Sequence, residues 1–227
     1  HEKQNISSVL LHESTIWIFP ARLENVTCCY DIKKGKFHVD TRITEVLHKH
    51  KSSKGVFSPF YYADKNTLWM VCYGGNAYWK YDLANGNSEL FEFSDEGMQL
   101  SGICCVDNYK WFSFLDSGKV MRIGEGGGRE YWEKVRSEKK PFSNIVNVGS
   151  RLVFMPCFSD NIALMDIENG EIQQIGLKTE KIRTAMKERT RNFCMNGNDL
   201  YLLPYQGEEL YKVDGITGKV ISVKIVS

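Results

Sequence analysis

The sequence has 227 residues, of which 42% are hydrophobic and 25% are charged, with 29 basic against 28 acidic side chains. This balance of charge argues against a dedicated nucleic-acid protein, and no apolar run is long enough for a transmembrane helix. We therefore expect neither nucleic-acid nor membrane partners. The length suits one all-β domain with a sizeable core or two small domains.

The seven cysteines are an odd number and show no CxxC spacing. Neither a zinc site nor a thioredoxin-type motif is therefore predicted, and we expect no cofactor. Most of them lie in apolar, strand-like runs such as 103–106, as free buried cysteines do. This favours a reducing, cytoplasmic location, although a chain that starts at His1 leaves open a removed signal peptide.

One pattern recurs five times along the chain: an apolar strand, then a strand that ends in Asp, then a Gly. In chain order the copies are Ile16–Pro20 with Asp31 and Gly35, Leu68–Cys72 with Asp82 and Gly86, Trp111–Phe114 with Arg122 and Gly126, Leu152–Pro156 with Asp166 and Gly170, and Asp199–Tyr205 with Asp214 and Gly218. In the third copy Arg122 is aligned with the Asp of the others. Successive Asp positions are 51, 40, 44 and 48 residues apart, a period typical of propellers and solenoids.

Each repeat fits four strands, with a tight turn between the third and the fourth. In that turn Asp can accept hydrogen bonds from its own backbone, and Gly can take the positive φ that such turns need. The sequence therefore predicts an all-β fold, a β-propeller of five recognisable four-stranded blades, either complete or part of a larger ring. The expected blades are 7–43, 55–95, 99–137, 143–178 and 191–227.

The repeat resembles the blades of kelch, NHL and related β-propeller proteins over nearly the whole chain. The WD dipeptide and Gly-His pair of WD repeats are missing, as is the paired-Gly signature of kelch repeats. The resemblance therefore implies the fold alone, and no family's site residues can be transferred to this chain.

Propellers bind ligands at one mouth of their central channel, beside the starts of the inner strands. Small polar residues precede each apolar strand by eight to ten positions: Ser8, Ser58, Ser101, Asn144 and Asn192. One interpretation is a polar ring that hydrogen-bonds a sugar or a peptide. The alternative is that a loop-to-strand junction favours Ser and Asn in any protein.

Aromatic residues follow the second strand in three repeats, at Tyr73, Phe158 and Tyr205. Exposed rings beside polar groups are typical of carbohydrate and peptide sites. The alternative is that these rings pack between neighbouring blades.

Two connectors break the pattern. His48 and His50 form an HxH in the first connector, without the further ligands that a metal site needs. The second connector, 178–189, is rich in helix formers and predicts a short helix.

Three functions remain open from the sequence. The first is a non-catalytic binding module for a polar ligand, such as a sugar or a peptide, or for a protein partner. The second is a propeller enzyme, a lyase or hydrolase with an axial active site. The third is a structural portion of a larger chain. Neither a catalytic residue nor the oligomeric state is predicted.

Overall fold

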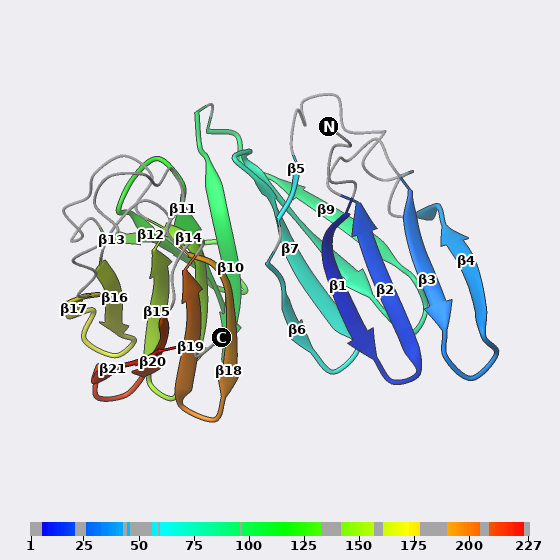
Figure 1. Ribbon diagram of the computed structural model, residues 1–227. Coiled ribbons are helices and arrows are strands. Elements are labelled where there is room, and N and C mark those ends of the chain that lie inside the picture. Colours follow the sequence, from blue (N-terminus) through cyan, green and yellow to red (C-terminus); the bar gives the residue numbers. More distant parts are fainter. Residues whose placement is uncertain are drawn as a thin grey trace. The chain divides into compact units, whose positions relative to one another are not determined.

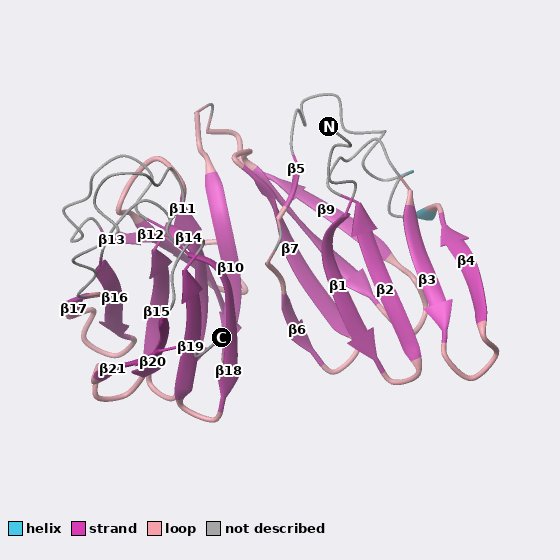
Figure 2. Cartoon of the chain, in the orientation of Figure 1, coloured by secondary structure: helices cyan, strands magenta, loops and turns pink. Residues whose placement is uncertain are grey.

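A computed structural model of the chain describes residues 6–20, 26–42, 45, 56–58, 60–95, 97–132, 142–156, 161–177, 190–204 and 209–224. Its elements are strands, β1 to β21, which form five antiparallel sheets (Figure 2). The predicted all-β propeller organisation with five blades is thus confirmed. The chain divides into two compact units, unit 1 (1–103) and unit 2 (104–227) (Figure 1). No described helix is long and apolar enough to cross a bilayer.

Unit 1 holds blades 1 and 2. Blade 1 has the order β1-β2-β3-β4, and in blade 2 the order is β5-β7-β8-β9 with β6 also paired to β7. The strands are β1 (Ile6–His12), β2 (Thr15–Pro20), β3 (Thr27–Asp31), β4 (Lys36–Asp40), β5 (Val56–Phe57), β6 (Tyr62–Asp64), β7 (Thr67–Tyr73), β8 (Ala77–Asp82) and β9 (Ser88–Glu92). The first strand of blade 3, β10 (Leu100–Val106), begins in unit 1.

Unit 2 holds the rest of blade 3 and all of blades 4 and 5. Every sheet follows the sequence order, β10-β11-β12-β13, β14-β15-β16-β17 and β18-β19-β20-β21. The strands are β11 (Tyr109–Phe114), β12 (Val120–Ile123), β13 (Arg129–Trp132), β14 (Phe142–Val148), β15 (Arg151–Pro156), β16 (Asn161–Asp166), β17 (Ile172–Gly176), β18 (Thr190–Asn196), β19 (Asp199–Pro204), β20 (Glu209–Asp214) and β21 (Val220–Lys224).

The turn between the third and fourth strands has the predicted chemistry. The Asp82 carboxylate accepts hydrogen bonds from the backbone N–H groups two and three residues on, at 2.9 and 3.2 Å. Asp166 and Asp214 accept the same pair of bonds. Gly86 lies at φ 77°, and the other turn glycines are also in the left-handed region. Because these bonds favour the ionised form, backbone N–H donation lowers the pKa of Asp82 and of Asp214.

Blade 3 departs from the repeat in a way that corrects the sequence alignment. Lys110 pairs with Ile123 and Trp111 pairs with Arg122, which places Gly124 opposite the first residue of β11. In blade 2 the residue in that place is the turn Asp itself, since Thr67, the first residue of β7, pairs with Asp82. Gly124, and not Arg122, therefore occupies the Asp position of blade 3.

The inner strands of three blades share a second irregularity. In β1, β14 and β18 the pairing register shifts by one residue near the start of the strand. In each case the first residue of the inner strand faces a proline, which is Pro20, Pro156 or Pro204. Since proline has no N–H to donate to the sheet, a bulge in the facing strand fits this position.

Blades bury their faces against their neighbours in the sequence. We call the face of a blade that packs on the next blade its downstream face, and the opposite one its upstream face. In unit 1 one buried cluster joins blade 1, through Leu10, Trp17, Phe19 and Cys29, to blade 2, through Leu68, Met70, Cys72, Ala77, Trp79, Tyr81 and Leu83. In unit 2 an equivalent cluster joins blade 4, through Val148, Val153, Met155, Ile162 and Leu164, to blade 5, through Leu200, Leu202, Tyr211 and Val213.

Candidate functional site

Three of the predicted site residues lie near one end of β7 in unit 1. Val56 pairs with Tyr73, and the backbone N–H of Ser58 donates to the carbonyl of Val71 at 3.3 Å. The loop after Tyr73 is joined to the start of β10, next to Ser101, by two backbone hydrogen bonds. These run from the N–H of residue 74 to the carbonyl of residue 100 and from the N–H of residue 100 to the carbonyl of residue 75, both at 2.8 Å.

The side chains of this group differ sharply in exposure. Ser58 and Ser101 are completely buried, and the Ser58 hydroxyl accepts a hydrogen bond from the backbone N–H of Phe60 at 3.1 Å. Tyr73 is partly exposed and is followed by Gly74, which is exposed at φ 75°. The structure therefore offers a ring and a glycine loop at the surface, held by two buried serines and a backbone clamp. We call Tyr73, Gly74 and Gly75 the β7 loop.

In unit 2 the predicted residues are described only in part. Asn144 is 2% exposed, and its neighbour Ser143 is 6% exposed. Asn192 pairs with Leu203 through the backbone. Phe158 and Tyr205 lie outside the described residues, as do His48, His50 and the predicted helix at 178–189.

The polar positions do not share one register. Ser8, Asn144 and Asn192 each follow directly on an inner-strand bulge and precede the turn into the second strand by the same interval. Ser58 instead follows β5, in an inner strand that is interrupted before β6, and Ser101 is the second residue of β10. The recurring small polar residue is thus a feature of the bulge in three blades, with a different setting in the other two.

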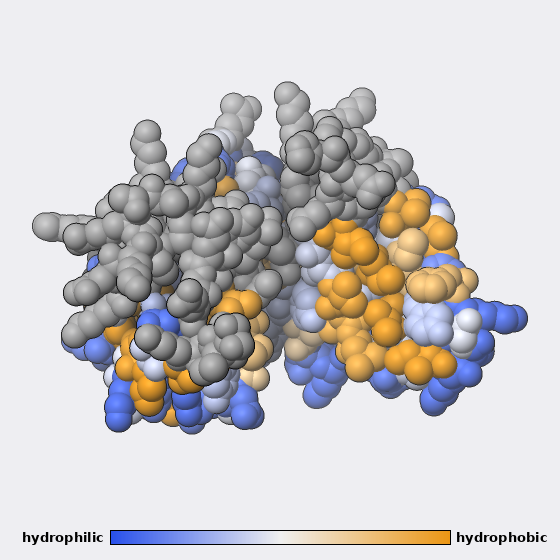
Figure 3. Space-filling view, viewed as in Figure 1, coloured by the Kyte–Doolittle hydropathy of each residue, from blue (hydrophilic) through white to orange (hydrophobic). Residues whose placement is uncertain are grey.

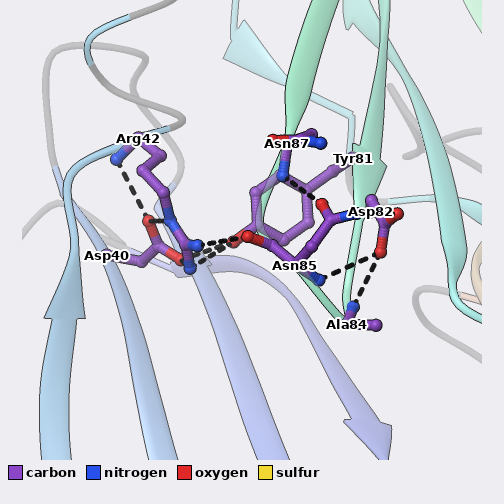
Figure 4. Close-up of polar contacts among 7 residues, drawn as sticks. All are labelled: Asp40, Arg42, Tyr81, Asp82, Ala84, Asn85 and Asn87. Atoms are coloured by element: carbon purple, nitrogen blue, oxygen red, sulfur yellow. Dashed lines mark hydrogen bonds and ion pairs between the residues drawn. The ribbon is translucent and has the colours of Figure 1, made fainter.

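A buried polar cluster in unit 1 was not predicted from the sequence (Figure 4). Asp40, at the end of β4, accepts hydrogen bonds from the Arg42 side chain, through Nε at 2.9 Å and through Nη2, and from the Tyr81 hydroxyl. Arg42 also donates from Nη2 to the Tyr81 oxygen at 3.1 Å and from Nη1 to the carbonyl of Asn85 at 2.9 Å. We call Asp40, Arg42 and Tyr81 the blade 1–2 latch, because it joins the two blades.

Burial and hydrogen bonding set the ionisation of the latch. Burial alone would raise the pKa of Asp40, but the hydrogen bonds from Arg42 and Tyr81 outweigh it and the pKa is lowered. Burial, together with donation to Asp40, raises the pKa of Tyr81. Burial, with the Asp40 carboxylate nearby, raises the pKa of Cys29 to about 12. At neutral pH the carboxylate is therefore charged, while the phenol and the thiol are neutral.

The latch is closed to a ligand by its own contacts. The guanidinium of Arg42 lies against the turn of blade 2, where a Cβ added to Gly86 would come within 1.5 Å of Nη1. The ring of Tyr81 is fully buried between Trp17 and Trp79, with ring centroids at 5.2 and 6.2 Å. A group with a perturbed pKa in a cleft is a candidate for catalysis, but this one is held between two blades.

Arg122 of blade 3 is enclosed by aromatic rings in unit 2. Its guanidinium carbon lies 4.3 Å from the ring centre of Tyr109 and 5.2 Å from the ring centres of Trp111 and Trp132. It also donates to Glu130 at 2.6 Å. The protein's own arginine therefore fills this aromatic cage, which has a structural role.

The cysteines among the described residues are all free thiols. Cys29, Cys72 and Cys104 are buried, while Cys194 is exposed. Within the described ranges no group of three or more His, Cys, Asp or Glu side chains is arranged to hold a metal ion.

Comparisons with known proteins define the class to which this fold belongs. No protein family model matches the sequence, and no curated protein matches it. Virginiamycin B lyase from Staphylococcus aureus is similar in structure, with a TM-score of 0.71 and 15% identity over 100% of this chain and 72% of that chain. A streptogramin B lyase structure gives a TM-score of 0.75 at 14% identity, over 100% of this chain and 71% of that one.

A third similar structure comes from a nidogen/laminin complex, with a TM-score of 0.65 and 10% identity over 96% of this chain and 80% of that chain. At these identities the likeness shows the fold alone. The chain is therefore a β-propeller protein whose similar structures include lyases and other propellers.

Proposed function

We propose that this chain is a non-catalytic binding module that recognises a polar ligand, such as a sugar or a peptide, or a protein partner. The contact surface that we assign to it is the β7 loop of unit 1. The observation that carries the proposal is the partly exposed ring of Tyr73 beside two glycines, on a loop that two backbone hydrogen bonds of 2.8 Å fix to β10.

Preorganisation supports this assignment. A loop held by backbone bonds loses little freedom when a ligand arrives, so more of the contact energy appears as affinity. Tyrosine supplies a large apolar area with a polar tip, and exposed glycine lets a ligand approach the main chain. The buried hydroxyls of Ser58 and Ser101 belong to the support of the loop rather than to its contact surface.

The alternative of a propeller enzyme gains no support from the perturbed groups of unit 1. The tyrosine and the aspartate with shifted pKa values, Tyr81 and Asp40, are bonded to each other and to Arg42. The similarity to two lyases concerns the fold alone.

The test uses glycan and peptide arrays probed with the fluorescently labelled protein. Tyr73→Ala should weaken binding to the positive spots by about tenfold or more, whereas Tyr73→Phe should retain most of it. Tyr131→Ala is the matched control, because Tyr131 is 47% exposed on β13 and lies outside the β7 loop.

Two results would overturn the proposal. One is unchanged array binding by Tyr73→Ala. The other is a fall of more than about 5 °C in the melting temperature of Tyr73→Ala, which would show that the ring is part of the core.

A further inference from the structure

Blade 1 has a second apolar face, opposite to the one that packs on blade 2. Pairing across β1 to β4 places two rows of side chains on this upstream face, each running across all four strands. The rows are Val9, Ile18, Cys28 and Val39, and Leu11, Ile16, Tyr30 and Phe37. The rings of Tyr30 and Phe37 are in contact, with their centroids 4.6 Å apart.

This upstream face is exposed to an unusual degree. Val9 is 51% exposed, Leu11 62%, Phe37 70% and Val39 55%. In the space-filling view, hydrophobic residues gather over β1 and β2 of unit 1 (Figure 3). A contiguous apolar patch of this kind marks an interaction surface rather than scattered surface hydrophobics.

The same positions are buried in other blades. Ile16 and Ile18 are the second and fourth residues of β2, as Leu200 and Leu202 are of β19. Both leucines are fully buried in the cluster that joins blades 4 and 5. The upstream face of blade 1 therefore has the side chains of a surface that is covered by another sheet.

We propose that a second copy of this chain covers the upstream face of blade 1, with the two blade 1 faces packed on each other around a twofold axis. None of the eight side chains in the two rows is charged, so the pairing buries no unpaired charge. Twofold pairing of identical patches is the commonest arrangement in homo-oligomers, and sheets stack face to face at about 10 Å.

The size of the face predicts weak association. A sheet of four strands spaced about 4.8 Å apart, with strands of at most seven residues at about 3.4 Å each, offers on the order of 450 Å² per partner. Specific interfaces bury about 800 Å² per partner. We therefore expect a dimer with a micromolar dissociation constant.

The exposed face of blade 5 is a poorer candidate for self-association. It includes Leu203, Ile221 and Val223, which are 40%, 46% and 52% exposed. It also holds the ion pair between Lys212 and Asp199, at 2.7 Å. Covering this ion pair would cost desolvation that blade 1 does not require.

The experiment is sedimentation equilibrium of the 227-residue protein over a wide range of concentration. The wild type should shift from monomer to dimer in the micromolar range. Leu11→Lys and Phe37→Lys should each raise the dissociation constant at least tenfold, while Ile221→Lys on blade 5 should leave it within twofold. Circular dichroism of each variant shows whether it is folded.

A second measurement needs no substitution. Cys28, in the centre of the face, is partly exposed, and Cys194 in unit 2 is exposed. Thiol labelling followed by peptide mass analysis should slow at Cys28, and not at Cys194, as the protein concentration rises. A monomer at every concentration, or a dimer that Leu11→Lys and Phe37→Lys leave intact, would overturn the proposal.

Discussion

The two units use different chemistry at the same place in the repeat. In unit 1 the turn glycine of blade 2, Gly86, is covered by the guanidinium of Arg42. In unit 2 the turn glycines of blades 4 and 5 are covered by Trp132 and by Ile175. A blade junction therefore requires a glycine with something packed on it. A buried ion pair, an aromatic ring and an aliphatic side chain all meet that requirement.

The difference has consequences for stability. A charged latch depends on both partners, since a buried carboxylate that loses its donors keeps the cost of its desolvation. An apolar contact loses only area and leaves a cavity. Unit 1 should therefore be the more sensitive of the two to pH and to single substitutions at its junction.

The largest effect is expected for Asp40→Ala. Removing the carboxylate strands the Arg42 charge and the buried Tyr81 hydroxyl. Because the Arg42 side chain is 50% exposed, we expect a loss of about 2–3 kcal/mol, below the 3–5 kcal/mol of a fully buried pair. Urea unfolding measures it. A loss below about 1 kcal/mol would show that the latch is no stronger than a surface ion pair.

The second effect sharpens the comparison of the turn glycines. Gly86→Ala and Gly218→Ala both force a positive φ on alanine, which costs about 1–2 kcal/mol. Their added Cβ atoms also meet a neighbour, Arg42 Nη1 at 1.5 Å and Ile175 Cδ1 at 2.4 Å. Gly35→Ala is the matched control, because its nearest neighbour is 4.0 Å away. Thermal unfolding should place both variants clearly below Gly35→Ala, and three equal melting temperatures would contradict the packing argument.

The third effect concerns pH. The pKa of Asp40 is lower in the folded protein than its ordinary value, so the unfolded chain binds more protons. The latch thus contributes stability above the unfolded pKa of about 4, and this contribution is lost as the pH falls through the folded pKa. The stability gap between the wild type and Asp40→Asn should therefore narrow from pH 6 to pH 3. A constant gap would show that the carboxylate is not the sensitive group.

The smallest effect is expected at the surface ion pair of unit 2. Lys212 and Asp199 are 36% and 30% exposed. Asp199→Asn should therefore cost less than about 1 kcal/mol, and added salt should shrink the difference. A cost as large as that of Asp40→Ala would remove the contrast between buried and exposed pairs.

The repeat made most of the fold predictable. The Asp and Gly of the turn have a local purpose, which a sequence shows directly, and the structure confirms their hydrogen bonds at Asp82, Asp166 and Asp214. The alignment of Arg122 was wrong because the turn of blade 3 is shorter. Its Gly127 donates to Gly124 at 3.0 Å, three residues back, whereas Gly86 donates four residues back to Asp82.

The latch and the loop site were less accessible to sequence reasoning. Asp40 and Arg42 follow a strand and look like ordinary surface charges, and only the pairing of two blades brings Tyr81 onto them. Ser58, Tyr73 and Ser101 were singled out correctly as neighbours of the strand ends. Their burial could not be predicted, because it depends on how the loop after β7 meets β10.

One crossed measurement tests the account most directly. Array binding and urea unfolding are measured for Tyr73→Ala and for Asp40→Asn under the same conditions, well below melting. The account predicts that Tyr73→Ala loses binding and keeps its stability, whereas Asp40→Asn loses stability and keeps its binding. Loss of binding by folded Asp40→Asn, with Tyr73→Ala binding as the wild type does, would contradict it and place function at the blade 1–2 latch.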